Sequence, residues 1–167
     1  RGDSTSGKSS ACFPCAISIG STWDMNLINQ LGVALGEEAK VKDVDVLLGP
    51  TINIHRHPLG GRHFESFSED PFLTGKIATE YVKGVQSQNV AACLKHFIGN
   101  DTEYERHLVS SNIDEKTLRE IYLLPFEMGV KEGNAQVVMS AYNKLNNIYC
   151  SSHKELLIDI LKDEWGF

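Results

Sequence analysis

Short apolar runs alternate along the chain with longer segments in which apolar residues recur every three or four positions. Short runs of this kind predict buried strands, and the longer periodic segments predict helices. The predicted strands are residues 16–19, 44–48, 90–94 and 136–141. The predicted helices are residues 23 to about 42, 72 to about 86, 114–131 and 152–165.

Polar residues at the helix starts support these boundaries. Asp70 precedes Pro71, and Asp114 opens the third predicted helix, so each carboxylate is placed to cap the first turn and to meet the helix dipole. Pro125 lies inside the third helix, where a missing N–H predicts a kink.

Strands that are apolar on both faces and alternate with helices are typical of a parallel sheet covered on both sides. Both an open doubly wound sheet and a (β/α)₈ barrel fit, and both bind ligands at the carboxyl ends of the strands. Polar residues follow three predicted strands, after Gly49, at Lys95-His96 and at Tyr142-Asn143, which favours the barrel. Four strands make only half of one, and a complete barrel has about 250 residues. The sequence therefore predicts an α/β chain in which residues 1–167 are one incomplete barrel domain.

Composition excludes some partners. The apolar and charged fractions, 41% and 23%, are ordinary for a soluble globular protein. A net charge of −6 and a pI near 5.5 argue against nucleic acid and anionic membranes as partners. No apolar run approaches the roughly 18 residues of a membrane span. No signal peptide is visible, but the sequence opens on Arg1 without Met, so it leaves the localisation open.

A long polar loop, residues 53–71, connects the second predicted strand to the helix after it. Gly60-Gly61 permits close approach of the backbone to a ligand, and Arg62 adds a planar fork of donors. Lys95 and His96 supply donors of different reach, which suits the neighbouring hydroxyls of a polyol. The alternative is an ordered surface loop held by local ion pairs.

Two short motifs have simpler explanations than the functions they suggest. Cys12 and Cys15 have the C-x-x-C spacing, but a redox pair needs a preceding strand and a following helix, and a zinc site needs a second ligand pair. Residues 2–9 fit the phosphate-loop pattern of nucleotide hydrolases, which requires a helix directly after it. Pro14 would break that helix, so the phosphate-loop interpretation is not favoured. The residues indicate no metal and no cofactor.

Three linked motifs resemble glycoside hydrolase family 3, and its β-glucosidase branch most. They are residues 56–71, Lys95-His96-Phe97 with Asn100-Asp101-x-Glu103-x-x-Arg106, and residues 138–143. The likeness runs from Arg1 to Phe167 in matching order. The N-acetylhexosaminidase branch carries a His-containing loop after its Lys-His pair, and this chain does not.

The resemblance implies a barrel that binds the non-reducing sugar of a β-glucoside or oligosaccharide and hydrolyses with retention of configuration. By position, Arg62, Lys95 and His96 would hold sugar hydroxyls. Met139 and Tyr142 would line the same subsite. Glu65 and Arg106 would brace the loops around it.

The resemblance also implies that the two catalytic carboxyl groups lie elsewhere. In the family the nucleophile is an Asp that would follow Phe167, the acid/base Glu belongs to a second domain, and a further sugar-binding Asp precedes the Arg1 position. We therefore expect the rest of the barrel and a second domain as partners, and no activity from this chain alone. The alternative is a sugar-binding module without catalysis.

Overall fold

A computed structural model describes residues 9–167. The phosphate-loop match lies outside these residues except for Ser9. Residues 9–15, where its helix would have to run, are not helical, and the first helix begins at Ala16. No helix within residues 9–167 is both long and apolar enough to cross a membrane.

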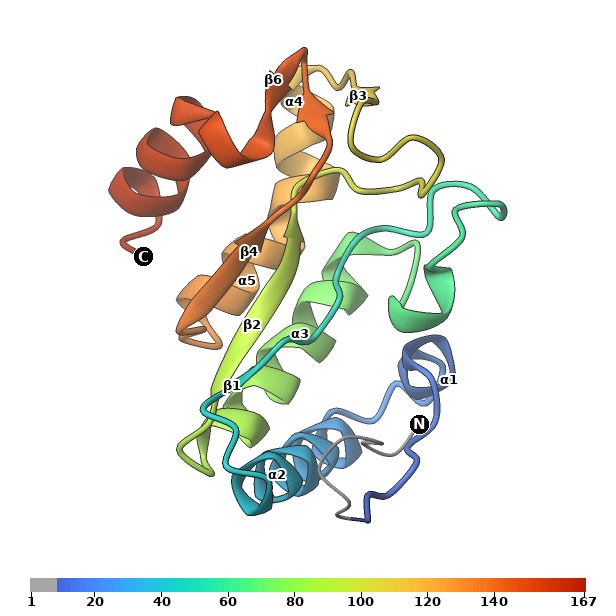
Figure 1. The fold of residues 1–167 in the computed structure, drawn as a ribbon, viewed down its shortest axis with the longest axis vertical. Helices are drawn as coiled ribbons and strands as arrows, with labels where there is room; N and C mark the ends of the chain where they lie inside the picture. Colours follow the sequence, from blue (N-terminus) through green and yellow to red (C-terminus); the bar gives the residue numbers. More distant parts are fainter. Residues whose placement is uncertain (1–8) are drawn as a thin grey trace.

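Three parallel strands form the centre of the molecule (Figure 1). They are β1 (Val46–Leu47), β2 (Ala91–Phe97) and β4 (Val137–Ser140), in the order β1-β2-β4. Thr51 extends the pairing of β1 with β2 through a parallel bridge to Lys95. β2 pairs with β4 from Cys93 to Phe97, with a register shift between Lys95 and Phe97. Three of the predicted strands are thus confirmed, and their carboxyl ends meet at one edge.

Long helices connect the strands. They are α2 (Met25–Val41), α3 (Pro71–Gln86) and a third segment made of α4 (Glu115–Thr117), η2 (Leu118–Leu123) and α5 (Leu124–Lys131). The last helix is η4 (Glu155–Glu164). α2 packs on α3 and α3 packs on α5, so helices that are consecutive in this series lie side by side along the sheet (Figure 1). This succession of strand and helix is the arrangement of a (β/α)₈ barrel, of which the chain forms a part.

Both predicted aspartate caps are present. Asp70 Oδ1 accepts from Leu73 N–H at 2.8 Å, and Asp114 Oδ1 accepts from Thr117 N–H at 3.0 Å. Pro125 stands at the second position of α5, directly after the wide π-type turns of η2, so the predicted helix is irregular there.

The prediction of a strand at residues 16–19 is wrong. These residues form α1 (Ala16–Gly20), in which Ile19 N–H bonds to Cys15 C=O, and the hydroxyls of Ser21 and Thr22 bond to carbonyls of its last turn. Four apolar residues are too few for periodicity to distinguish a strand from one helical turn. The helical spacing lets Ala16 and Ile19 pack on the core and leaves Ile17 exposed.

Short elements complete the chain near the carboxyl ends of the central strands. They are η1 (His63–Glu65), β3 (Ser110–Ser111), β5 (Lys144–Leu145), β6 (Ile148–Tyr149) and η3 (Cys150–Ser152). β3, β5 and β6 form a second small sheet. It ties the loop that leaves β2 to the loop that leaves β4.

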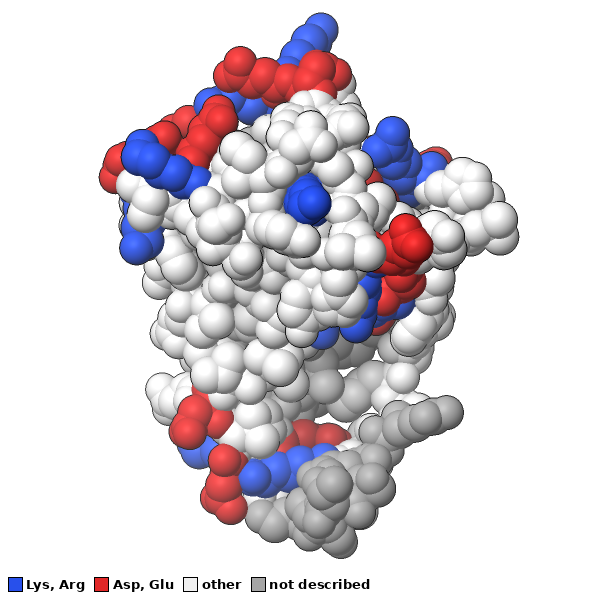
Figure 2. Space-filling model, turned by 45° about the horizontal axis from the view of Figure 1, so that its top comes forward, with Lys and Arg blue, Asp and Glu red and all other residues white. Residues whose placement is uncertain are grey.

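The strands of the central sheet differ in how far neighbouring segments bury them. Most of β2 is buried, including Leu94 and Phe97 at 0% exposure, as expected for a strand covered on both faces. Val46 and Leu48 are 38% and 57% exposed, so the expectation of two covered faces fails at β1. On the face shown in Figure 2, charged side chains of both signs lie in mixed groups around a broad area that is white except for an isolated blue side chain within it.

Candidate functional site

Lys95 and His96 occupy the carboxyl end of β2, and the neighbouring strands bring other predicted residues to them. Ile52 N–H donates to Lys95 C=O at 2.8 Å, which holds the chain after β1 alongside. Met139 of β4 is in register with Lys95 on the other side. Parallel pairing therefore places residues from three segments at one end of the sheet.

Arg62 reaches this end of the sheet from the 53–71 loop. Its Nε donates to Glu65 Oε1 at 2.6 Å, and its Nη1 lies 3.5 Å from His96 Nε2. Glu65 Oε2 accepts from Thr51 Oγ1 at 2.9 Å and lies 3.8 Å from Lys95 Nζ. One carboxylate thus contacts both cations.

Asn53 holds His96 and is a site residue that the sequence did not identify. Its Oδ1 accepts from His96 N–H at 2.9 Å and lies 3.1 Å from His96 Nδ1, while its Nδ2 donates to His96 C=O at 2.9 Å. Both residues are buried, at 7% and 6% exposure. Since Asn53 Oδ1 can only accept, it selects the tautomer with the proton on Nδ1 and leaves Nε2 as an acceptor facing Arg62.

The electrostatics of the site follow from burial and from the crowding of cations. Burial, with the nearby charges of Arg62 and Lys95, lowers the pKa of His96 to about 4, so the ring is neutral near pH 7. Burial likewise lowers the pKa of Lys95, against the attraction of Glu65. Burial alone would raise the pKa of Glu65, but its hydrogen bonds from Arg62 and Thr51 outweigh burial, so the pKa falls below its usual value. The site is a cluster of donors with one neutral imidazole.

The loop after β2 adds Glu103 and Arg106. Glu103 Oε2 accepts from Arg106 Nη1 at 2.8 Å, and Glu103 Oε1 lies 3.6 Å from Arg62 Nη1. The Arg106 guanidinium stands 5.3 Å from the ring centre of Tyr142, which is 59% exposed. Arg106 therefore lies against the Tyr142 ring, and the rest of the Tyr142 side chain is largely exposed to solvent. Met139, by contrast, is half-buried.

The carboxylates nearest these residues differ in their surroundings, and the carboxylate oxygens of Asp101 are buried without a hydrogen-bond partner among residues 9–167. Glu65 and Glu103 each face arginine. The Asp101 side chain is 10% exposed, with Arg56 Nη1 at 3.8 Å, and burial raises its pKa to about 6. Asp70 caps α3, as its position before Pro71 predicts.

The C-x-x-C pair is followed by a helix, α1, where a strand was expected, but it has no strand before it within residues 9–15. Cys12 and Cys15 are exposed free thiols, and Cys15 precedes α1 with no strand between Ser9 and α1. Among residues 9–167, no group of three or more His, Cys, Asp or Glu side chains is arranged to hold a metal ion.

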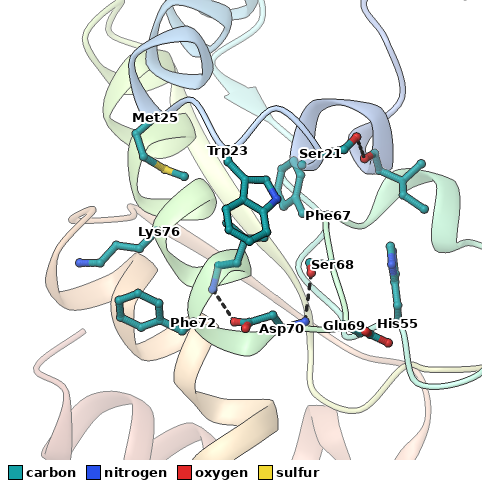
Figure 3. Close-up of a pocket in the computed structure, with 13 residues that line it drawn as sticks. Ser21, Trp23, Met25, His55, Phe67, Ser68, Glu69, Asp70, Phe72 and Lys76 are labelled. Carbon is teal, nitrogen blue, oxygen red and sulfur yellow. Dashed lines mark hydrogen bonds between the residues drawn. The ribbon is translucent and has the colours of Figure 1, made fainter.

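A separate cavity of about 720 Å³ opens between α1 and the start of α3 (Figure 3). Its wall includes the exposed Trp23 and Phe72, with Lys76 Nζ 5.5 Å from the centre of the Phe72 ring. None of the predicted sugar-binding residues lines it. The donor cluster around Arg62, Lys95 and His96 is therefore a different site from this apolar hollow.

The chain is similar to β-glucosidases over nearly all of its length. It is 56% identical over 166 residues to a β-glucosidase of Rhizobium radiobacter, covering 99% of this chain and 20% of that protein. It is 53% identical over 154 residues to thermostable β-glucosidase B of Acetivibrio thermocellus, covering 92% of this chain and 20% of that protein. The chain thus spans about a fifth of the length of these relatives.

Solved structures give the same result. β-Glucosidase 3B of Thermotoga neapolitana, in complex with α-D-glucose, superimposes with a TM-score of 0.95 at 49% identity, covering 99% of this chain and 23% of that one. The β-glucosidase of Bifidobacterium adolescentis gives 0.95 at 45% identity, covering 99% and 24%. The model of the glycosyl hydrolase family 3 N terminal domain matches residues 1–167. The chain therefore belongs to glycoside hydrolase family 3.

Proposed function

We propose that this chain is the sugar-binding part of a β-glucosidase that removes terminal non-reducing β-D-glucosyl residues with retention of configuration. The observation that carries the proposal is the convergence of Arg62, Lys95 and His96 at the end of β2. Arg62 and Lys95 donate, and neutral His96 offers an acceptor, so together they match hydroxyls that both donate and accept. The glucose bound by a structural relative supports a sugar as the ligand.

Each side chain has a task in this proposal. Arg62 and Lys95 bind neighbouring hydroxyls, and His96 accepts from one of them. Met139 and the exposed ring of Tyr142 line the apolar side of the sugar. Glu65 holds Arg62 and Lys95 in position before the sugar arrives, which lowers the cost of ordering them on binding.

We propose further that the chain does not hydrolyse glucosides by itself. Retaining hydrolysis needs two carboxyl groups about 5–5.5 Å apart, one as nucleophile and one as acid/base. Glu65 and Glu103 form ion pairs with arginine, and the Asp101 side chain is nearly buried. In this proposal the nucleophile and the acid/base therefore come from outside residues 1–167. The expected sources are an Asp after Phe167 and a Glu in a second domain, which together with the remaining barrel complete the enzyme.

The test combines binding with turnover on the 167-residue chain. Glucose should bind, Lys95→Ala should weaken that binding about tenfold, and a chromogenic β-glucoside should not be cleaved faster than in buffer. Lys76→Ala is the matched control, because Lys76 pairs with Glu132 on the surface. Equal glucose affinity in both variants would remove the sugar-binding role, and measurable hydrolysis would show that the chain holds its own catalytic pair.

A further inference from the structure

Glu103 contacts two loops at once. It accepts from Asn100 Nδ2 at 3.4 Å and from Arg106 Nη1 at 2.8 Å within its own loop. Its Oε1 also lies 3.6 Å from Arg62 Nη1, across the gap to the 53–71 loop. The Glu103 side chain is 27% exposed, so these interactions are partly shielded from water.

The stem of Glu103 packs against Gly61 in the 53–71 loop. Gly61 has φ +85°, and a Cβ added there would lie 3.2 Å from Glu103 Cγ and 3.3 Å from Glu103 Cβ. A side chain at residue 61 would be strained and would press on Glu103. Shape and charge therefore fix the same carboxylate against the residue that precedes Arg62.

The contacts of Glu103 continue to the loop after β4. Arg106, which donates to Glu103, has its guanidinium 5.3 Å from the centre of the Tyr142 ring. The ring of the next residue, His107, has its centre 4.7 Å from the centre of the Tyr142 ring. Tyr142 is 59% exposed, and the Arg106 guanidinium and the tilted His107 ring both lie against its aromatic ring.

We infer that Glu103 is a positioning residue that sets where Arg62 and Tyr142 stand relative to each other, and hence how a sugar fits between them. Glu65 fixes the Nε side of Arg62, while Glu103 attracts Nη1, the nitrogen that also faces His96. The inference rests on the proposed sugar site, and it adds a residue outside the set expected to touch the sugar.

The test replaces Glu103 with Gln, which keeps the packing on Gly61 and removes the charge. Glu105→Gln is the matched control: an exposed carboxylate two residues away in the same loop. We expect Glu103→Gln to weaken glucose binding about tenfold with little change in melting temperature, and Glu105→Gln to have no such effect. In a Tyr142→Ala background the same change should weaken binding less than about threefold, because the two residues act through one contact chain.

A second readout separates this inference from the proposed function. In the ligand-free chain, the NMR ring signals of Tyr142 should shift in Glu103→Gln and stay in place in Glu105→Gln. Unmoved ring signals, or additive effects in the double variant, would overturn the role of Glu103. Shifted ring signals in a chain that binds no glucose would uphold that role and overturn the sugar site.

Discussion

Asn53 Oδ1 is the common acceptor for the backbone N–H and the ring of His96, at 2.9 and 3.1 Å from the two nitrogens. The pair joins the start of the 53–71 loop to the end of β2, across 43 positions of sequence. Because Asn53 contacts Nδ1 of the imidazole, the other ring nitrogen, Nε2, is the one directed at Arg62. A single buried amide thus sets both the path of the loop and the chemistry of the ring.

Asn53→Ala should destabilise the chain, because it leaves the N–H, the C=O and the ring nitrogen of His96 buried without these partners. The expected loss is about 1–3 kcal/mol in the free energy of unfolding, measured by urea titration at pH 7. Asn112→Ala is the control, since the Asn112 side chain is exposed and accepts from the Ser110 hydroxyl at 2.8 Å. Similar losses in both variants would contradict the special role of Asn53.

The stability of the chain should fall in mild acid because of His96. Its pKa is about 4 in the folded chain and about 6.5 when unfolded, so the unfolded state binds more protons between these values. The free energy of unfolding therefore declines as pH drops from about 6.5 to 4, by up to about 3 kcal/mol, and this contribution levels off below pH 4. The charges that act on the pKa of the ring are those of Arg62, Lys95 and Arg106, which lower it, and of Glu65, which raises it.

Urea titrations at pH 7 and pH 4.5 measure this decline, and His96→Gln should make it shallower. A ring titration followed by NMR with a midpoint near 6.5 in the folded chain would refute the prediction.

Glu65→Gln should lower the pKa of Lys95 further. Burial already lowers it, and the charge of Glu65 is the main opposing influence, while Arg62 repels the ammonium. Removing the carboxylate leaves the two cations facing each other. The measurement is an NMR titration of the Lys95 side chain, with Glu69→Gln, an exposed change in the same loop, as the control. An unchanged Lys95 titration in Glu65→Gln would show that the two groups do not interact.

Gly84→Ala should destabilise the packing of α2 on α3. A Cβ at residue 84 would lie 2.3 Å from Asn29 C=O and 2.9 Å from Gly32 Cα, and both are backbone atoms. Helix propensity alone would make Gly84→Ala stabilising by up to about 1 kcal/mol. We expect overpacking to outweigh this gain, so the free energy of unfolding should fall by about 1–3 kcal/mol. Lys83→Ala, on the exposed side of the same helix, should change stability by less than about 0.5 kcal/mol. A stabilising Gly84→Ala would mean that the helices have room to separate.

Sequence patterns predicted the elements that repeat the same signal over many residues. The helices α2 and α3 carry periodic apolar faces, and Asp70 and Asp114 mark the starts of α3 and α4 as capping residues do. The run at residues 16–19 is too short to show a period, and the sequence interpretation was wrong there. The uneven cover of β1 also escaped prediction, because the exposure of Val46 depends on which segments pack beside it.

Among the candidate site residues, Lys95 and His96 could be located from the sequence because they follow an apolar run, and they lie at the carboxyl end of β2, where barrels bind ligands. The pairing of Glu103 with Arg106 was expected from their positions in one loop. The contacts of Asn53 with His96 and of Glu103 with Arg62 were not, because these partners lie 43 and 41 positions apart in the chain. Spacing along a sequence reports neighbours on one element, and it carries no information about which loops meet in space. The one available signal for Asn53 was its position, as a polar residue directly after the apolar Ile52 in the segment that follows β1.

The packing of α2 on α3 and of α3 on α5 has a consequence for how the chain acquires its structure. α3 packs on the earlier α2, α5 packs on the earlier α3, and the central strands are added in chain order, β2 beside β1 and β4 beside β2. Each pairing nevertheless joins distant positions, Val46 with Ala91 and Cys93 with Val137, so a long loop must close before each strand is added. The chain can therefore build its layers in the order in which a ribosome releases them, with each finished unit serving as the template for the next.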